Sequence, residues 1–220
     1  MKADKAPQPR ILVLVSGNGS NLQALIDASR ERDFPGQIIA VGSNRPQAFA
    51  LERAAQANIE TFVIDHTQHP SREEFDAMLL AEILRHNPDV VVLAGFMRIL
   101  GTDFVRALRG KMLNIHPSLL PAYTGLNTHQ RVLEAGDSVH GVSVHFVTEE
   151  LDGGPVIAQA EVKVADDDTP ETLAAKVQEK EHILYPIVLR WFCEGRIQLG
   201  SDFVTFDGEL LKAPMRLPDN

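Results

Sequence analysis

Asn114 and His116 stand two residues apart, and this pair is the first place where the sequence indicates chemistry. Residues 112–115 are apolar enough for a strand, and Pro117 ends its pairing directly after His116. Side chains two positions apart on a strand face the same way, so the amide and the imidazole would project together. An amide N–H can hold a developing oxyanion while an imidazole moves a proton, which suits acyl transfer. The alternative is a histidine that packs at a strand end.

Asp152 adds a carboxylate from another part of the chain, in the sequence Leu-Asp-Gly-Gly-Pro. The two glycines allow unusual backbone dihedrals, and Pro155 stiffens the exit from the turn. A carboxylate fixed there can reach the open end of a sheet and favour the protonated form of His116. The alternative is an ordinary hairpin turn. We interpret Asn114, His116 and Asp152 together as a candidate catalytic trio.

A second candidate site is the sequence Ser-Gly-Asn-Gly-Ser-Asn at residues 16–21, between an apolar run and a helical pattern. Small residues let the backbone approach an anion, and the free amides of a helix N-terminus point toward it. Leu22 stands where a dinucleotide fingerprint needs a glycine, and the loop has no Gly-Lys-Ser/Thr for a triphosphate. The remaining functional interpretation is a monophosphate bound by Gly19, Ser20 and Asn21. The alternative is a glycine turn that binds nothing.

The elements that must position these groups follow from hydrophobic patterning. Short, branched apolar runs typical of buried parallel strands lie at residues 11–15, 38–41, 61–64 and 90–94. Helical patterns lie between them at residues 21–32, 48–58 and 71–85. In the third helix Leu84 belongs to the predicted apolar side, Ser71 is the predicted N-cap and Glu74 its capping-box partner. This alternation predicts an open, doubly wound, mostly parallel α/β sheet that binds ligands beyond the carboxyl ends of its strands.

The second half of the chain has a different pattern. Residues 142–147 and 156–164 are expected to be antiparallel strands, residues 169–194 a long helix, and residues 203–211 a small hairpin. No linker or repeat divides the chain, so we expect a single domain over residues 1–220, with residues 1–10 as a flexible leader.

Composition excludes several classes of protein. The 220 residues carry 21 Lys and Arg against 30 Asp and Glu, a net charge of −9 that disfavours nucleic acid as the main partner. A single cysteine excludes an internal disulfide framework and a multi-cysteine zinc site. The leader has no apolar stretch of a secretory signal, and no apolar run is long enough to span a membrane. We expect a cytoplasmic globular protein, with its oligomeric state open between monomer and homodimer.

Taken together, four segments of the chain resemble the glycinamide ribonucleotide transformylase family, the folate-dependent formyltransferases of purine synthesis. The resemblance covers residues 11 to about 195 and is carried by residues 16–27, 90–100, 113–121 and 141–157. It implies the formyltransferase fold, with a phosphate-binding half at about residues 11–110 and a catalytic and folate-binding half at about residues 111–220. It also implies that the formyl group of the co-substrate 10-formyltetrahydrofolate passes to the amine of glycinamide ribonucleotide without a metal.

The resemblance also assigns roles by position. Asn114, His116 and Asp152 match the catalytic trio, and Gly19, Ser20 and Asn21 would bind the phosphate of the ribonucleotide. Glu181, which from its place in a helix alone would be a solvated residue, matches the carboxylate that receives the glycinamide. The positions that match formyl-folate contacts are Arg72, Met97, Arg98, Ile99, Leu100 and Asn114.

The chain differs from the family pattern at one place, and three alternative functions stay open. Relatives often carry His-Thr-His in the loop after Gly125, where this chain has Asn127, Thr128 and His129. That loop, within residues 118–139, is the predicted lid. Two other formyl-folate enzymes share the core: methionyl-tRNA formyltransferase, expected to need an added RNA-binding domain, and formyltetrahydrofolate deformylase, a hydrolase. A non-catalytic nucleotide-binding module would explain the glycine loop but leave the trio without a role.

Overall fold

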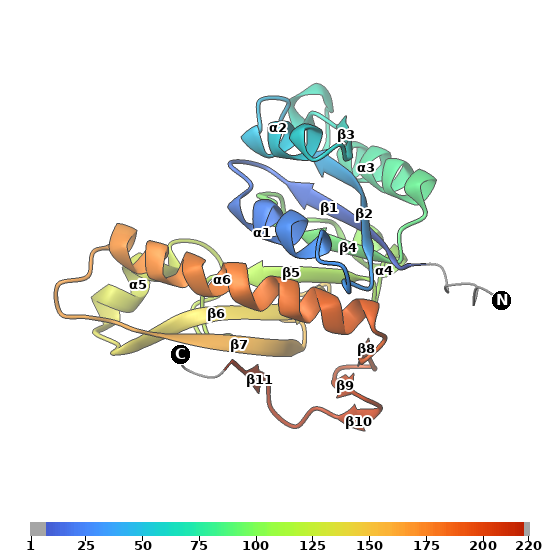
Figure 1. The fold of residues 1–220 in the computed structure, drawn as a ribbon. Coiled ribbons are helices and arrows are strands. Elements are labelled where there is room, and N and C mark those ends of the chain that lie inside the picture. The colour runs from blue at the N-terminus through green and yellow to red at the C-terminus, as the bar shows by residue number, and fades with distance from the viewer. Residues whose placement is uncertain (1–7, 218–220) are drawn as a thin grey trace.

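The main sheet runs through the whole molecule. A computed structural model describes residues 8–217, and its eight-stranded sheet has the order β11-β7-β6-β5-β4-β1-β2-β3 (Figure 1). Strands β3, β2, β1, β4 and β5 are parallel, whereas β6 is antiparallel to both β5 and β7. The strands are β1 Arg10–Val15, β2 Gln37–Ser43, β3 Glu60–Val63, β4 Val90–Leu93, β5 Met112–His116, β6 Val139–Phe146, β7 Val156–Lys163 and β11 Met215–Arg216.

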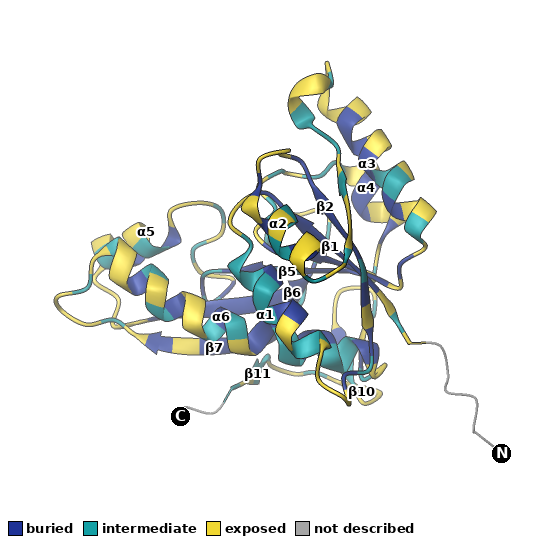
Figure 2. Ribbon diagram, turned by 45° about the horizontal axis from the view of Figure 1, so that its top comes forward, coloured by how far each residue is buried: buried dark blue, intermediate teal, exposed yellow. Residues whose placement is uncertain are grey.

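Helices cover both faces of this sheet. The helices are α1 Ser20–Ser29, α2 Phe49–Gln56, α3 Arg72–His86, α4 Thr102–Ala107, α5 Thr128–Ala135 and α6 Pro170–Cys193. Buried side chains of α1, α2, α5 and α6 form one core, and those of α3 and α4 form the other. Figure 2 shows the sheet between them as mostly buried, with exposed residues on the outer sides of the helices.

The two cores follow directly from the alternation of side chains along a strand. In β1, Ile11, Val13 and Val15 enter the first core, whereas Leu12 and Leu14 enter the second. A strand buried on both sides must be apolar at every position, which explains the unbroken run that the sequence shows. At its carboxyl end, β1 leads directly into residues 16–21, which begin at that edge of the sheet.

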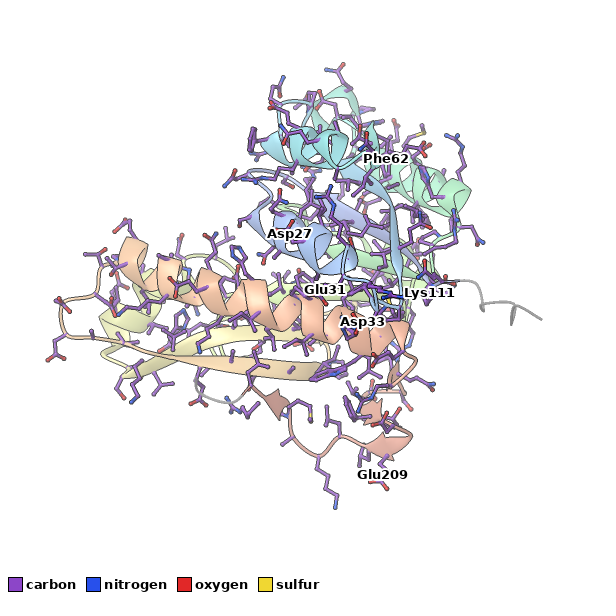
Figure 3. The ribbon with its side chains drawn as sticks, in the orientation of Figure 1. Asp27, Glu31, Asp33, Phe62, Lys111 and Glu209 are labelled. Carbon is purple, nitrogen blue, oxygen red and sulfur yellow. The ribbon has the colours of Figure 1, made fainter. Side chains whose placement is uncertain are left out.

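The long helix α6 holds the two halves of the sheet together. It runs beside α1 and across β6 and β7 (Figure 1). The Tyr185 hydroxyl on its buried side lies 2.9 Å from the carbonyl oxygen of Leu93 and 3.1 Å from that of Leu113, at neighbouring strands. Near its end, Arg190 contacts Glu31 and Asp33, which Figure 3 labels beside α6. The helix therefore fixes β4 and β5 relative to α1.

A small second sheet follows α6. It consists of β8 Ile197–Leu199, β9 Val204–Phe206 and β10 Glu209–Leu210, all antiparallel. The predicted hairpin is β9 and β10, joined through Asp207 and Gly208, which both have positive φ. No helix within residues 8–217 combines the length and the apolar character that a bilayer crossing requires.

The predicted α/β fold is confirmed, with corrections in detail. Arg10 begins β1, so the described end of the expected leader is ordered, while residues 1–7 lie outside the described residues. Ser71 caps α3 by accepting from the Glu74 amide, as predicted, but the reciprocal bond from the Glu74 side chain to the Ser71 amide, which the predicted capping box requires, is absent among the described residues. Leu84, which was predicted on the apolar side of α3, is 56% exposed, whereas Asp76 of the same helix is buried. The sequence analysis missed α4 and α5, which are short and have no side-chain cap among the described residues.

Candidate active site

His116 is the last residue of β5 and lies buried at the open edge of the sheet. Its Nε2 lies 2.9 Å from the carbonyl oxygen of Tyr123, and its Nδ1 lies 3.5 Å from Oδ2 of Asp152. The His116 and Asp152 side chains are only 7% and 8% exposed. A carbonyl oxygen can only accept, so Nε2 of His116 carries a proton. The two groups predicted to act together do meet.

The turn that carries Asp152 is built for close approach. Asp152 has a φ of +52°, and its Oδ2 accepts a hydrogen bond of 2.8 Å from the amide of Gly125. A Cβ at Gly154 would overlap the carbonyl oxygen of Phe146, so only glycine fits there. The Gly-Gly-Pro sequence therefore brings the carboxylate against both β5 and the segment that precedes α5.

Asn114 is oriented by a histidine on the neighbouring strand. β5 and β6 pair antiparallel with Asn114 opposite His145, and Asn114 Nδ2 lies 3.1 Å from His145 Nε2. His145 Nδ1 lies 2.9 Å from the carbonyl oxygen of Phe146, so Nδ1 donates and Nε2 accepts. Burial lowers the pKa of His145 to about 4, which keeps the ring neutral and able to accept. One N–H of the Asn114 amide remains for a ligand.

A cleft of about 700 Å³ opens over these groups. Met97–Leu100 form one wall, residues 125–129 and 147–152 form others, and the trio is part of the lining. Four apolar side chains on the walls are more than half exposed: Met97, Ile99, Leu126 and Leu151. Such a concentration of exposed apolar side chains around a few polar groups is typical of a site for a flat organic ligand.

The glycine loop forms the N-terminus of α1, as predicted. Gly19 is the N-cap with a φ of +75°, and no side chain of the described residues caps this end of the helix. The first amides of α1 are therefore available to an anion. A Cβ at Gly19 would come within 2.5 Å of the Ala50 Cβ, so glycine is required by packing as well as by φ. Ser20 Oγ accepts a hydrogen bond of 3.0 Å from Gln178 of α6.

Glu181 connects the loop to the trio. The side chain is buried in α6, and its Oε2 accepts a hydrogen bond of 2.8 Å from Asn21 Nδ2. Burial raises the pKa of Glu181, while the Asn21 hydrogen bond and the nearby His116 partly oppose that rise. The Oδ1 atom of Asn21 is buried without a partner among the described residues. A buried carboxylate between an anion site and an imidazole is placed to receive a ligand amine.

The structure brings most of the predicted site residues together, but not all of them. Asn114, His116, Asp152 and Met97–Leu100 share the cleft, and Glu181 with Asn21 forms its neighbour. Arg72 is not among the residues that line the cleft; it begins α3, and its Nε lies 3.8 Å from Asp76. Asn127 lines the cleft as the N-cap of α5, with a φ of +57° that asparagine tolerates well. Within residues 8–217, no group of three His, Cys, Asp or Glu could hold a metal ion.

Three participants were missed by sequence reasoning. They are His145, the Tyr123 carbonyl group and the Gly125 amide. His145 could have been found only from the pairing of β5 with β6, whereas the sequence analysis paired residues 142–147 with 156–164 alone. The two backbone groups have no sequence signal, because any residue carries them. They show that the segment before α5 closes over His116 and Asp152.

Known proteins that are similar to this chain in sequence and fold carry related names. Residues 9–189 match the family model described as "Formyl transferase". Phosphoribosylglycinamide formyltransferase of Escherichia coli (strain K12) is 53% identical over 201 residues, 91% of this chain and 95% of that protein. The human trifunctional purine biosynthetic protein adenosine-3 is 46% identical over 193 residues, which are 88% of this chain but only 19% of that protein. A solved phosphoribosylglycinamide formyltransferase from Coxiella burnetii, in complex with CHES, has a TM-score of 0.91 at 50% identity, covering 96% of this chain and 100% of that one.

Proposed function

The chain belongs to the formyl transferase family, and from that premise we propose that its cleft transfers a formyl group in purine biosynthesis. The donor is 10-formyltetrahydrofolate, and the acceptor is the amine of N1-(5-phospho-D-ribosyl)glycinamide, or glycinamide ribonucleotide. The products are formylglycinamide ribonucleotide and tetrahydrofolate. The observation that supports this most strongly is the meeting of Asn114, His116 and Asp152 in one cleft with an apolar wall.

The cleft fits the donor by its mixture of surfaces. The ring faces of a folate suit the exposed apolar side chains of Met97, Ile99 and Leu151, whereas the edge of its pteridine ring needs polar partners. Backbone groups between them supply the polar contacts that fix a ring in one orientation. Arg98 lines the same wall, and its guanidinium lies over the ring of Phe75, 5.1 Å from the ring centroid. We propose that Arg98 and Leu100 complete the donor site, with Arg72 contributing only from outside the lining.

The acceptor fits the other end of the site. The amides of Gly19, Ser20 and Asn21 would hold the phosphate at the N-terminus of α1. Glu181 would accept a hydrogen bond from the glycinamide amine, which must be neutral to attack. Because burial raises the pKa of Glu181, this carboxylate attracts a proton more readily than an exposed one and is a suitable partner for an amine N–H.

The trio then stabilises the reaction and moves a proton. The free N–H of Asn114 and a protonated His116 donate to the oxyanion that develops on the formyl oxygen. Asp152 stabilises the imidazolium while the amine attacks. As the bond from the formyl carbon to the folate nitrogen breaks, His116 gives its Nε2 proton to that nitrogen and exchanges its hydrogen bond with Tyr123 for one to the ligand. The amine that attacked then loses its extra proton to the imidazole, which restores the protonated His116. Holding both substrates in one cleft contributes to the rate through orientation.

Two further properties belong to this proposal. The sheet that continues from β3 to β11 supports a single formyltransferase domain in which both halves serve one reaction. We place this reaction in the cytoplasm, with small molecules as the only partners it requires. The one cysteine, Cys193, fits a reducing compartment, because it is buried and burial raises its pKa to about 12, which leaves an unreactive thiol.

Formyl-folate turnover with different acceptors tests the proposal. We expect tetrahydrofolate to form only when glycinamide ribonucleotide is present, at a rate that saturates with its concentration. Ribose 5-phosphate is the matched control, because it carries the phosphate but no amine. Equal turnover with no acceptor would instead identify a deformylase that hydrolyses the donor.

A further inference from the structure

Ser16 stands at the junction of the two proposed subsites. It follows β1 directly, is 3% exposed, and precedes the loop of residues 17–21. Its Oγ accepts a hydrogen bond of 2.7 Å from the amide of Met97, in the wall of the cleft. Its hydroxyl donates a hydrogen bond of 2.5 Å to Oδ1 of Asn44, which follows β2 and is 1% exposed. One hydroxyl therefore joins the carboxyl ends of β4, β1 and β2.

Asn44 is itself held in place. His66 Nδ1 lies 2.8 Å from the carbonyl oxygen of Asn44, and a carbonyl can only accept. The Ser16 hydroxyl has a single proton and donates it in the hydrogen bond to Asn44 Oδ1. The lone pairs of Ser16 Oγ are left to accept from the Met97 amide. The two hydrogen bonds therefore run in one direction: the Met97 amide donates to Ser16, and Ser16 donates to Asn44.

The segment beyond Met97 is tied at its other end as well. Oδ2 of Asp76, a buried residue of α3, accepts a hydrogen bond of 2.7 Å from the amide of Gly101. The backbone from Met97 to Gly101 is thus held at its two ends by the buried side chains of Ser16 and Asp76. Met97 and Ile99 project from it with more than half of their surface exposed. Each of these two hydrogen bonds therefore helps to set where the segment lies in the wall of the cleft.

The loop on the other side of Ser16 is also fixed to its surroundings. The carbonyl oxygen of Gly17 accepts from the Ala50 amide at 3.1 Å, and that of Asn18 accepts from Arg53 Nε at 2.8 Å. A phosphate bound to the amides that follow would add further contacts to this loop, which begins directly after Ser16. Ser16 therefore lies between the loop held by Ala50 and Arg53 and the wall that its hydroxyl holds at Met97.

We infer that Ser16 is a positioning residue shared by both subsites, and that its hydroxyl couples acceptor binding in the loop to donor binding in the cleft. This inference rests on the proposed function, because it takes the two ligands from there. Occupation of the loop fixes Ser16, Ser16 fixes the Met97 amide, and the wall is then preorganised for the donor. Coupling of this kind is reciprocal, so the donor must strengthen acceptor binding by the same factor.

Calorimetric titration measures the coupling without turnover. Glycinamide ribonucleotide is titrated into the protein with and without saturating tetrahydrofolate, the product that cannot react. In the unmodified protein we expect the affinity to rise about fivefold or more when tetrahydrofolate is bound, at the lower end of typical coupling. Ser16→Ala should bind each ligand alone but show less than about twofold coupling, measured as the ratio of the acceptor affinities with and without tetrahydrofolate.

Ser43→Ala is the matched control. Ser43 is also buried at the end of a neighbouring strand, but its Oγ bonds only to the backbone of Arg45 in its own loop. This variant loses one buried hydroxyl and should keep the coupling. Persistent coupling in Ser16→Ala, or its loss in both variants, would overturn the role of Ser16.

Amide hydrogen exchange in the unmodified protein gives a second test that needs no variant. Glycinamide ribonucleotide alone should slow exchange of the Met97 amide several-fold, because its acceptor becomes fixed. Unchanged exchange at Met97 in a protein that binds the acceptor would refute the inference. If neither ligand binds, the proposed function fails instead, so the two failures are distinguishable.

Discussion

The two ends of the proposed site are built in different ways. At the N-terminus of α1, where Gly19 is the N-cap, backbone amides make up the proposed anion site, and side chains play a supporting part. At the end of β5, side chains from β5, β6 and the turn at Asp152 converge on one point. The first end depends on the shape of one local turn. The second end depends on strand register, because Asn114 meets His145 only when β5 and β6 pair as they do. The first should therefore be sensitive to backbone changes, and the second to single side chains.

His116→Ala tests the side-chain end and should have the largest effect. It removes both the proton donor and one oxyanion contact, so we expect kcat to fall about 1,000-fold or more, because each role typically contributes two or more powers of ten. Acceptor affinity at the loop should change little. Steady-state kinetics and a separate titration measure both. His69→Ala, outside the lining of the cleft, is the control and should keep full activity. A fall of less than tenfold in His116→Ala would remove this histidine from the proton transfer.

Gly19→Val tests the backbone end. The branched side chain would meet Ala50 and force the loop out of its positive φ, so the amides would no longer point at the phosphate. We expect the acceptor KM to rise about 100-fold, which corresponds to the loss of one or two charge-assisted hydrogen bonds. Donor affinity should stay within about threefold, since the cleft is not touched.

Gly17→Ala is the matched control for that substitution. A Cβ at Gly17 would meet nothing within 4 Å, and its φ is not positive. An alanine there should leave the acceptor KM unchanged. If Gly17→Ala and Gly19→Val raised the acceptor KM equally, the loop would be sensitive to any side chain and the geometric argument would fail.

Acid should affect the β5–β6 end through its buried histidines. Burial lowers the pKa of His140 and of His145 from 6.5 to about 4, so the unfolded chain binds more protons between these pH values. Stability must then fall as the pH drops from 7 toward 4, by about 2 kcal/mol per histidine at pH 5. His140 lies on β6 against His129 and Tyr123, and burial lowers the pKa of His129 as well.

His140→Gln measures that contribution. The variant should lose less stability on acidification, so its fall in Tm from pH 7 to pH 5 should be smaller by about 5 °C. His69→Gln is the control and should show the same fall as the unmodified protein. Thermal unfolding of the three proteins at both pH values decides the matter. Equal falls in all three would show that burial of His140 does not govern acid stability.

The contrast between the two ends also explains what the sequence could predict. The loop, β1 and the helix after it form one local pattern, so spacing alone predicted that residues 16–21 open a helix, and that they bind an anion stays a prediction. Asn114, His116 and Asp152 were recognised as chemical groups, and the structure brings them together. His145 was missed because its role comes from long-range pairing, and the Tyr123 carbonyl because backbone groups have no sequence signature. From its place in a helix alone Glu181 would be a solvated residue; only the family resemblance singled it out, and the structure buries it against Asn21.

Ser20→Ala should have the smallest effect and gives the sharpest test of the backbone end. Ser20 lies in the loop, yet its Oγ already accepts from Gln178 of α6, so its hydroxyl is partly committed to the protein. If the phosphate is held mainly by amides, removing the hydroxyl removes at most one neutral hydrogen bond, about 1 kcal/mol or less. We therefore expect the acceptor KM to rise no more than about fivefold, with kcat unchanged. Gln178→Ala should give an equally small change, because it removes the same contact from the other side. A rise of 50-fold or more in Ser20→Ala alone would mean that a side chain, not the helix N-terminus, carries the phosphate, and the two ends of the site would then be built alike.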